Sequence, residues 1–193
     1  MMWSLHYLMG QWRPTIGDPS FVGWFTVGSY FGCATVASIL TFVNLKADRR
    51  PFFFWVVICI MMVLLGINKQ LDLQTLFGEV GRQIAKAQGW YDHRRVVQFW
   101  FIVAFAAVML GIFLWLVVIM RDLFGRFTLA FTGIFLLISF IVIRAASFHH
   151  VDEVLRIELF GTRFHRLLEL AGIFLIAVAG LKEIIRVRQT NGK

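Results

Sequence analysis

A short stretch near residue 150 concentrates the side chains that could do chemistry. The ten residues 144–153 contain an arginine, a serine, two adjacent histidines and two carboxylates, directly after a long apolar run. In a helix, His149 would share a face with Asp152 and Glu153, which follow it by three and four residues. Histidines and carboxylates spaced in this way are typical of metal sites and of general acid–base catalysis.

These residue types predict a metal-dependent reaction, in which histidines hold zinc or another divalent ion and a carboxylate acts as the base. His165 and Glu169, four residues apart, repeat the spacing in a second segment. The sequence contains no His-Glu-x-x-His motif and no cysteine cluster. The predicted metal ligands are His149, His150 and His165, and the predicted catalytic carboxylates are Asp72, Asp152 and Glu153.

Two other interpretations of the histidines stay open. A haem b needs two axial ligands from different helices, and His149 or His150 could supply one of them while His93 or His165 supplies the other. Such haems usually sit between histidines inside membrane spans, whereas here the histidines fall in polar segments. The remaining interpretation is that the histidines are interfacial residues, hydrogen-bonded by water and lipid headgroups.

Basic residues that flank the same polar segments predict a binding site for an anion. Lysine and arginine bind phosphate and carboxylate groups through charge-assisted hydrogen bonds. The candidates are Lys69, Arg94, Arg95 and Arg144. The alternative for the first three is a set of salt bridges with nearby carboxylates, namely Asp72, Glu79 and Asp92.

Arg144 differs from the other candidates because it lies about one turn inside an apolar run. Its side chain could extend to the interface, as long basic side chains do. An intramembrane charge is costly, however, and is usually paired or functional. Glu169 and Asp152 are the partners that the sequence offers for a buried ion pair with Arg144.

Composition and apolar patterning predict an integral membrane protein. The chain is 59% hydrophobic and 16% charged, with a mean hydropathy of +0.76, whereas soluble domains carry about 25% charged residues. The apolar residues form continuous blocks of about 17–25 residues, the length that crosses a hydrocarbon core. We expect an all-α membrane bundle of one domain, 1–193, with five transmembrane helices at about 21–45, 51–67, 96–120, 127–148 and 167–185.

The polar connection 68–95 between the second and third spans predicts a further helix. Within it Leu73, Phe77, Val80 and Ile84 recur at helical spacing, and Gly89 follows as a suitable helix stop. We expect an amphipathic helix within 70–88 that lies on the membrane surface or caps the bundle.

The spans themselves offer packing features. Glycines 23, 28 and 32, together with Ser29, form a small-residue stripe that could pack closely against another helix. Cys33 and Cys59 both lie inside apolar blocks, so we expect small buried hydrophobic residues and no disulfide. Residues 1–20 lack a charged n-region and contain two prolines, so we expect no secretory signal there.

The distribution of basic residues predicts the orientation. Five spans place the two ends of the chain on opposite sides. The turns 46–50 and 121–126 and the C-terminal tail pack basic residues into short segments next to the spans, where the positive-inside rule applies most strongly. We therefore place the C-terminus in the cytoplasm and the N-terminus outside. The formal charge of +8 is then explained by anchoring to anionic lipid, without nucleic acid as a partner.

Three sequence blocks resemble a group of uncharacterised multi-pass inner-membrane proteins of bacteria. The blocks are Asn68-Lys-Gln-Leu-Asp-Leu-Gln74, Gly89-Trp-Tyr-Asp-His-Arg-Arg95 and Arg144-Ala-Ala-Ser-Phe-His-His150. The resemblance covers roughly residues 60–170 and implies a bacterial inner-membrane location and this topology, but no activity. There is a looser resemblance to the alkaline ceramidase and adiponectin-receptor superfamily, which combines Ser, Asp and His residues around zinc at one end of the bundle. It implies that the corresponding residues here are Ser147, Asp72, His149, His150 and His165.

Two functional hypotheses from different classes follow. The first is a metal-dependent hydrolase that acts at the outer membrane boundary on a lipid or another anionic amphiphile. The second is a non-catalytic subunit that binds haem or quinone, or packs against other subunits of a larger membrane complex. A transporter is disfavoured, because the spans lack deep charged residues and paired broken helices.

Overall fold

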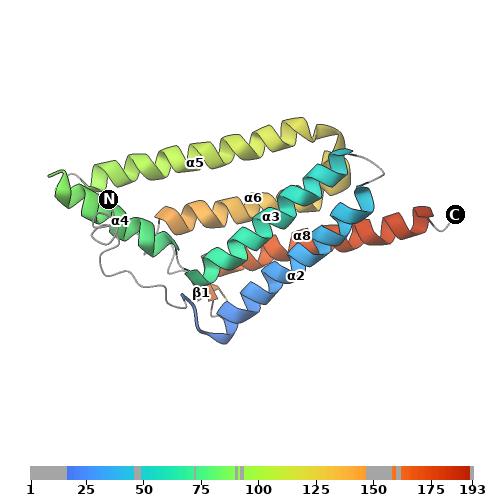
Figure 1. Ribbon diagram of the computed structural model, residues 1–193, viewed down its shortest axis with the longest axis horizontal. Helices are drawn as coiled ribbons and strands as arrows, with labels where there is room; N and C mark the ends of the chain where they lie inside the picture. Colours follow the sequence, from blue (N-terminus) through green and yellow to red (C-terminus); the bar gives the residue numbers. More distant parts are fainter. Residues whose placement is uncertain are drawn as a thin grey trace, which may run out of the picture.

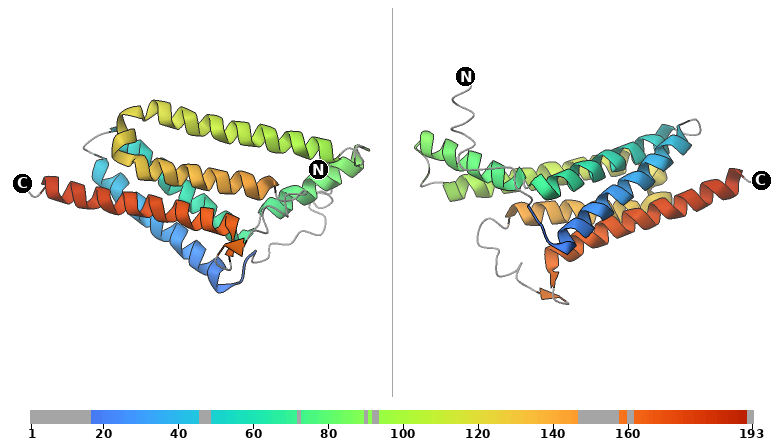
Figure 2. Two further views of the ribbon diagram at one scale, coloured as in Figure 1. Left: turned by 180° about the vertical axis from the view of Figure 1, so that it is seen from behind. Right: turned by 60° about the horizontal axis from the view of Figure 1, so that its bottom comes forward.

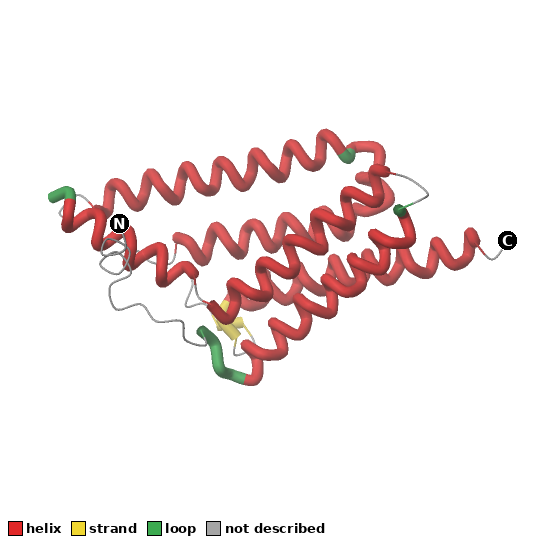
Figure 3. The backbone as a smooth tube through the Cα atoms, viewed as in Figure 1, coloured by secondary structure: helices red, strands yellow, loops and turns green. Residues whose placement is uncertain are grey.

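The computed structural model describes residues 17–45, 49–71, 73–89, 91, 94–146, 158–159 and 162–191. Within these residues the chain is almost entirely helical (Figures 1 and 3). The elements are α2 (Phe21–Asn44), α3 (Arg49–Leu71), α4 (Leu73–Ala87), α5 (Arg94–Ile119), the 3₁₀ turn η2 (Arg121–Leu123), α6 (Phe124–Ala146), the paired two-residue strands β1 (Glu158–Leu159) and β2 (Thr162–Arg163), and α8 (Phe164–Asn191).

The predicted all-α fold class is confirmed, whereas the number of spans is only partly supported. In the part of the chain that the structure describes, four helical segments could cross a membrane by length and composition: 21–44, 49–71, 99–119 and 121–145. The fifth predicted span, 167–185, lies within α8, which is not among the four. The uncharged stretch of α8 between Glu169 and Lys182 is only the twelve residues 170–181. Five spans therefore stay a prediction.

Four helices form the packed part of the bundle, and a fifth lies along one side. Helix α2 packs against α3 and α8, and α6 packs against α8. Helix α5 packs chiefly against α6 (Figures 1 and 2). Only 6% of the apolar window of α5 is buried, so this helix leaves most of its surface for lipid or another protein.

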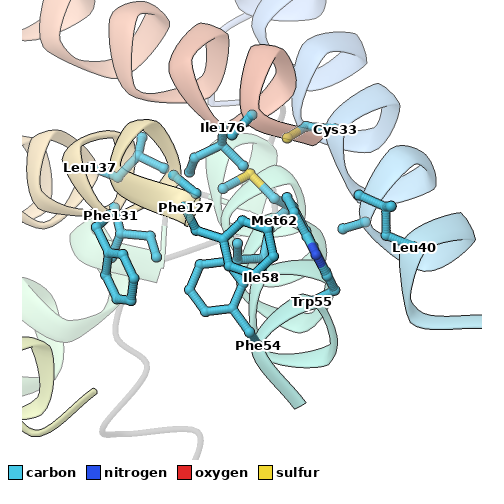
Figure 4. Packing of buried hydrophobic residues seen from close by; sticks show 14 of the residues in the cluster. Cys33, Leu40, Phe54, Trp55, Ile58, Met62, Phe127, Phe131, Leu137 and Ile176 are labelled. Atoms are coloured by element: carbon cyan, nitrogen blue, oxygen red, sulfur yellow. The ribbon is translucent and has the colours of Figure 1, made fainter. Parts of the chain in front are cut away.

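The core is built from interlocking aromatic and aliphatic side chains of α2, α3, α6 and α8. The rings of Phe54 and Phe127 stack with centroids 4.8 Å apart, and Trp55 and Phe131 pack around them (Figure 4). Phe127 also marks a kink, because its backbone (φ −115°, ψ 26°) is not helical. The predicted span begins at this residue because the charged turn 121–126 precedes it in the sequence, whereas α6 begins three positions earlier.

Glycines allow the closest helix contacts, but not the glycines that the sequence singled out. A Cβ atom at Gly133 of α6 would lie 2.7 Å from the carbonyl oxygen of Gly172 on α8, so these two backbones touch. At Gly28 and Gly32 a Cβ atom would meet open space among the described residues. The predicted stripe on α2 is therefore not a helix contact in this structure, because α2 packs through other residues.

The predicted helix within 70–88 is observed as α4, which ends as expected. The amide nitrogen of Gly89 donates to the carbonyl oxygen of Lys86, and Gly89 adopts a left-handed φ of +74°. In Figure 1, α4 leads from the end of α3 toward the start of α5. Its location on a membrane surface stays a prediction.

Candidate functional site

Helices α3 and α6 end at the same end of the bundle at which α2, α5 and α8 begin (Figure 1). A cavity lined by residues of these five helices lies toward that end. Its volume is about 310 Å³. All five helices contribute to its lining, which consists of Tyr30, Leu65, Asn68, Lys69, Phe101, Phe105, Phe140, Ile141, Arg144, Ala145 and Glu169. The polar and the apolar side chains of this set have different roles.

The polar side of the cavity is organised around the carboxylate of Glu169, which is 2% exposed. The ammonium group of Lys69 donates to Oε2 at 2.8 Å, and the hydroxyl of Tyr30 donates to Oε1 at 3.1 Å. Both carboxylate oxygens therefore have a hydrogen-bond partner. Removing a carboxylate and an ammonium from water is costly, and only good geometry with further hydrogen bonds offsets that cost.

Close helix contacts bring these three side chains together. A Cβ atom at Gly66 of α3 would lie 3.2 Å from the Cβ of Tyr30 on α2, so the two helices approach closely there. Lys69 follows Gly66 by three residues and shares its helix face. In the same way, Glu169 precedes Gly172, the contact point of α8 with α6, by three residues. Small residues thus fix the helices one turn from the ion pair.

Arg144, from the last turn of α6, lines the same cavity and is partly buried. The cavity therefore has two cationic side chains, Lys69 and Arg144, and one anionic side chain, Glu169, with a formal balance of +1. The amide of Asn68 adds a donor and an acceptor at the same end. Carboxylate and phosphate groups are the anions that lysine and arginine side chains bind.

The rest of the cavity wall is mostly apolar and largely aromatic. Phe101 and Phe105 of α5 stack on each other, with centroids 6.4 Å apart and planes 12° apart. Phe140 of α6 stacks on the ring of His165 at 6.4 Å. Phe101 is 67% exposed, so this wall continues onto the outer surface of α5. The site combines a charged end with an apolar wall that leads to surface suited to lipid.

The structure brings some of the predicted site residues together and does not describe others. Lys69 and Arg144 share the cavity, and His165 borders it through Phe140. Arg94 and Arg95 begin α5, but their side chains are not described. The remaining predicted residues lie outside the described part of the chain: Asp72, His149, His150, Asp152 and Glu153.

The metal prediction is therefore not tested at five of its six residues. Among the described residues, no group of three or more His, Cys, Asp or Glu side chains is placed to hold a metal ion. Lys69 pairs with Glu169, which the salt-bridge alternative did not include, and two of the carboxylates that it did include, Asp72 and Asp92, lie outside the described residues. Glu79 instead pairs with Arg82 on its own helix, at 3.3 Å.

Sequence reasoning missed the role of Tyr30. It lies in an apolar span, where its sequence context predicts only an aromatic packing residue. A buried tyrosine hydroxyl usually needs a hydrogen-bond partner, and Tyr30 is the only tyrosine among the residues of the five predicted spans. That signal could have pointed to a polar partner inside the bundle.

A second ion pair lies at the other end of α8. Arg126 of α6 donates from Nε to Oε2 of Glu183 at 3.2 Å and from Nη2 to Oε1. The Glu183 side chain is 4% exposed, whereas that of Arg126 is 28% exposed. At the same end Arg50 of α3 pairs with Asp122, which connects α3 to the turn η2.

No protein-family model, no curated protein and no solved structure matches this chain. The resemblance carried by residues 68–74, 89–95 and 144–150 therefore stays a prediction, and the function has to be inferred from the geometry of the cavity.

Proposed function

We propose that this chain is a multi-pass membrane protein that binds an anionic amphiphile in the cavity between α2, α3, α5, α6 and α8. The observation that carries the proposal is the cavity itself, whose lining combines two cationic side chains with aromatic side chains. The head of the ligand would lie near Lys69 and Arg144. Its apolar part would lie along Phe101 and Phe105.

The charges favour an anionic head over a neutral one. Two of the three charged side chains that line the cavity, Lys69 and Arg144, are cationic, and both can donate charge-assisted hydrogen bonds to a carboxylate, sulfonate or phosphate head. A quinone, the ligand of the alternative hypothesis, carries no charge that would attract them. An anionic head is therefore the better fit.

The size of the cavity also suits a ligand that extends into lipid. About 310 Å³ is near the lower end of the range for small-molecule sites. It would hold a head group and the first part of a chain. The exposed ring of Phe101 then provides apolar surface on which the rest of the chain could continue toward the bilayer.

Hydrolysis of the bound amphiphile is the second candidate, and one observation favours it. His165, a predicted metal ligand, stacks on Phe140, which lines the cavity. Four further predicted ligands and bases follow the end of α6 in the sequence, at three to seven residues after Ala146: His149, His150, Asp152 and Glu153. A metal held by these residues would supply the activated water.

Binding is tested with the purified full-length protein in nanodiscs and a fluorescent fatty acid as the probe. Arg144→Gln should weaken binding by about 10- to 100-fold, the worth of a charge-assisted hydrogen bond. Arg121→Gln, which removes an 83% exposed cation at the opposite end, is the matched control and should leave the affinity unchanged. Equal affinity of wild type and Arg144→Gln would contradict the proposal.

The neutral methyl ester of the same fatty acid separates the alternatives. Equal binding of acid and ester would favour a neutral ligand such as a quinone. Release of the free acid from the ester, abolished by His149→Ala or His150→Ala and accompanied by loss of bound zinc, would establish the hydrolase. Binding of the acid without turnover would leave the chain a binding protein.

We further propose that the chain lies in a bacterial inner membrane with the N-terminus outside. The support is the density of basic residues at the end of the bundle opposite the cavity, including Arg49, Arg50 and Arg121. Single cysteines at Ala87 and at Gln189, in a chain without Cys33 and Cys59, should differ in labelling by an impermeant maleimide on intact spheroplasts. Labelling at 189 but not at 87 would reverse the orientation.

A further inference from the structure

The end of the bundle opposite the cavity carries a second hollow, a groove of about 280 Å³ between α6 and α8. It is lined by Gly125, Arg126, Thr128, Leu129, Ala179, Lys182, Glu183 and Arg186. Three of these side chains are cationic and one is anionic, which gives a formal balance of +2. The groove is thus more basic than the cavity and lies far from it along α8.

We propose that this groove binds the phosphate of an anionic phospholipid. The proposal is independent of the amphiphile cavity. Basic pockets between membrane helices commonly bind phosphate-bearing lipid headgroups. Three features of the groove support this ligand: an oriented guanidinium, two basic side chains on one face of α8, and open space at Gly125.

The guanidinium of Arg126 is held in place by protein contacts. Two hydrogen bonds to the 4% exposed carboxylate of Glu183 fix its orientation, and its Cζ atom lies 5.1 Å from the centroid of the Phe127 ring. The carboxylate of Glu183 compensates the charge of Arg126. Lys182 and Arg186 add two further cationic side chains to the lining of the groove.

Lys182 and Arg186 are four residues apart and lie on one face of α8, so both can reach a single phosphate. Across the groove, Gly125 has no side chain, and a Cβ atom there would meet nothing within 4 Å among the described residues. Gly125 lines the groove together with Lys182 and Arg186, so this open space belongs to the same groove. A phosphate could enter it without displacing protein atoms.

The surroundings distinguish a lipid from free phosphate. Phe124, Leu181 and Ile185 flank the groove in the sequence and are 42%, 52% and 56% exposed. Apolar side chains exposed beside a basic groove provide surface for acyl chains, which inorganic phosphate lacks. The groove therefore matches a molecule with a phosphodiester and hydrocarbon chains.

Native mass spectrometry of the full-length protein with added phosphatidylglycerol tests the proposal. The double variant Lys182→Gln/Arg186→Gln should lower phosphatidylglycerol binding at least about tenfold, the worth of one charge-assisted hydrogen bond to the phosphate. The double variant Arg49→Gln/Arg188→Gln removes the same charge from exposed positions outside the groove and should lower binding less than about threefold. Equal losses in the two double variants would overturn the proposal.

A steric variant tests the groove without changing the charge of the protein. Gly125→Leu fills the open space and should reduce phosphatidylglycerol binding while the thermal midpoint of the protein stays close to that of wild type. Unchanged binding in this variant would overturn the groove as the site. Two competition experiments identify the class of ligand. Phosphatidylcholine should not compete with phosphatidylglycerol for the groove, and excess inorganic phosphate should not displace phosphatidylglycerol. Displacement by inorganic phosphate would make the groove a site for the free ion and overturn the lipid proposal.

Discussion

Glu169 and Glu183 lie fourteen residues apart on α8, about 21 Å along the helix, and the two carboxylates are held in different ways. Each is nearly buried and each pairs with a cation from a neighbouring helix. Lys69, the partner of Glu169, is 9% exposed, whereas Arg126, the partner of Glu183, is 28% exposed. The first pair is enclosed, and the second is open on its cationic side.

The comparison shows that the same kind of ion pair has two roles: it compensates a buried cation at one end and orients a partly exposed arginine at the other. At the enclosed end, the carboxylate of Glu169 compensates the charge of Lys69 and also accepts a hydrogen bond from Tyr30. The ion pair therefore makes it possible to bury a lysine next to apolar side chains. At the open end, Glu183 orients an arginine that water can also reach. The cost of losing one partner should therefore be much larger at the enclosed end.

The largest expected effect is that of Lys69→Met, which removes the cation and leaves Glu169 buried. Breaking a buried pair in this way costs about 3–5 kcal/mol, because a carboxylate is left without compensation. The free energy of unfolding, measured by denaturant titration of the purified protein in mixed micelles, should fall by this amount.

The double variant Lys69→Met/Glu169→Gln is the control for this effect. It leaves no unpaired charge, and the amide oxygen of glutamine still accepts from Tyr30. It should therefore be more stable than Lys69→Met alone. If the free energy of unfolding falls by the same amount in both variants, the unpaired charge of Glu169 is not the cause of the loss in Lys69→Met.

A smaller effect is expected at the open end from Glu183→Gln. The glutamine keeps the shape of the side chain and one acceptor for Arg126, and the 28% exposed guanidinium can gain hydrogen bonds from water. The loss should be about 1–2 kcal/mol, the worth of a hydrogen bond to a charged group. Measured in the same titration, a loss as large as that of Lys69→Met would remove the distinction between the two ends.

The apolar pattern predicted the helices well, because a long block without charge has few alternatives to a helix in a membrane. The first predicted span, 21–45, agrees with α2 at Phe21–Asn44. The second, 51–67, is shorter than α3, which continues to Leu71. The sequence predicts residues 68–71 to be the start of a polar connection. These residues are instead the last turn of a helix, in which Lys69 is buried against Glu169.

The pairing in the site could not be predicted, because its members come from distant parts of the chain. Lys69 and Glu169 are separated by 100 residues and Tyr30 and Glu169 by 139. Sequence spacing reports only neighbours on one helix, which is why it offered Asp72 and Glu79 as partners for Lys69. Which helices lie side by side is decided by contacts such as Gly133 against Gly172, and a glycine in an apolar run does not reveal its neighbour.

The smallest expected effect lies near the enclosed end, where the chain enters α2. Ser20 caps the helix: its hydroxyl accepts from the amide of Gly23 at 3.1 Å and donates to the carboxylate of Asp18 at 2.6 Å. The amide of Gly17 donates to the carbonyl oxygen of Gln70 at 2.8 Å, which ties this segment to the end of α3, one residue from Lys69. The hydrogen bonds from Ser20 hold the pKa of Asp18 below its usual value of 3.8.

The sign of the pH effect follows from this depressed pKa. The folded state binds a proton on Asp18 less readily than the unfolded state, so the contribution of Asp18 is complete above the unfolded pKa and is lost as the pH falls through the folded one. Lowering the pH from about 6 to about 3 should therefore destabilise wild type slightly more than Asp18→Asn. The comparison is made with the same denaturant titration at each pH. An identical loss in both proteins would mean that the capping hydrogen bonds do not depend on the charge of Asp18, and that the enclosed end is held by its ion pair alone.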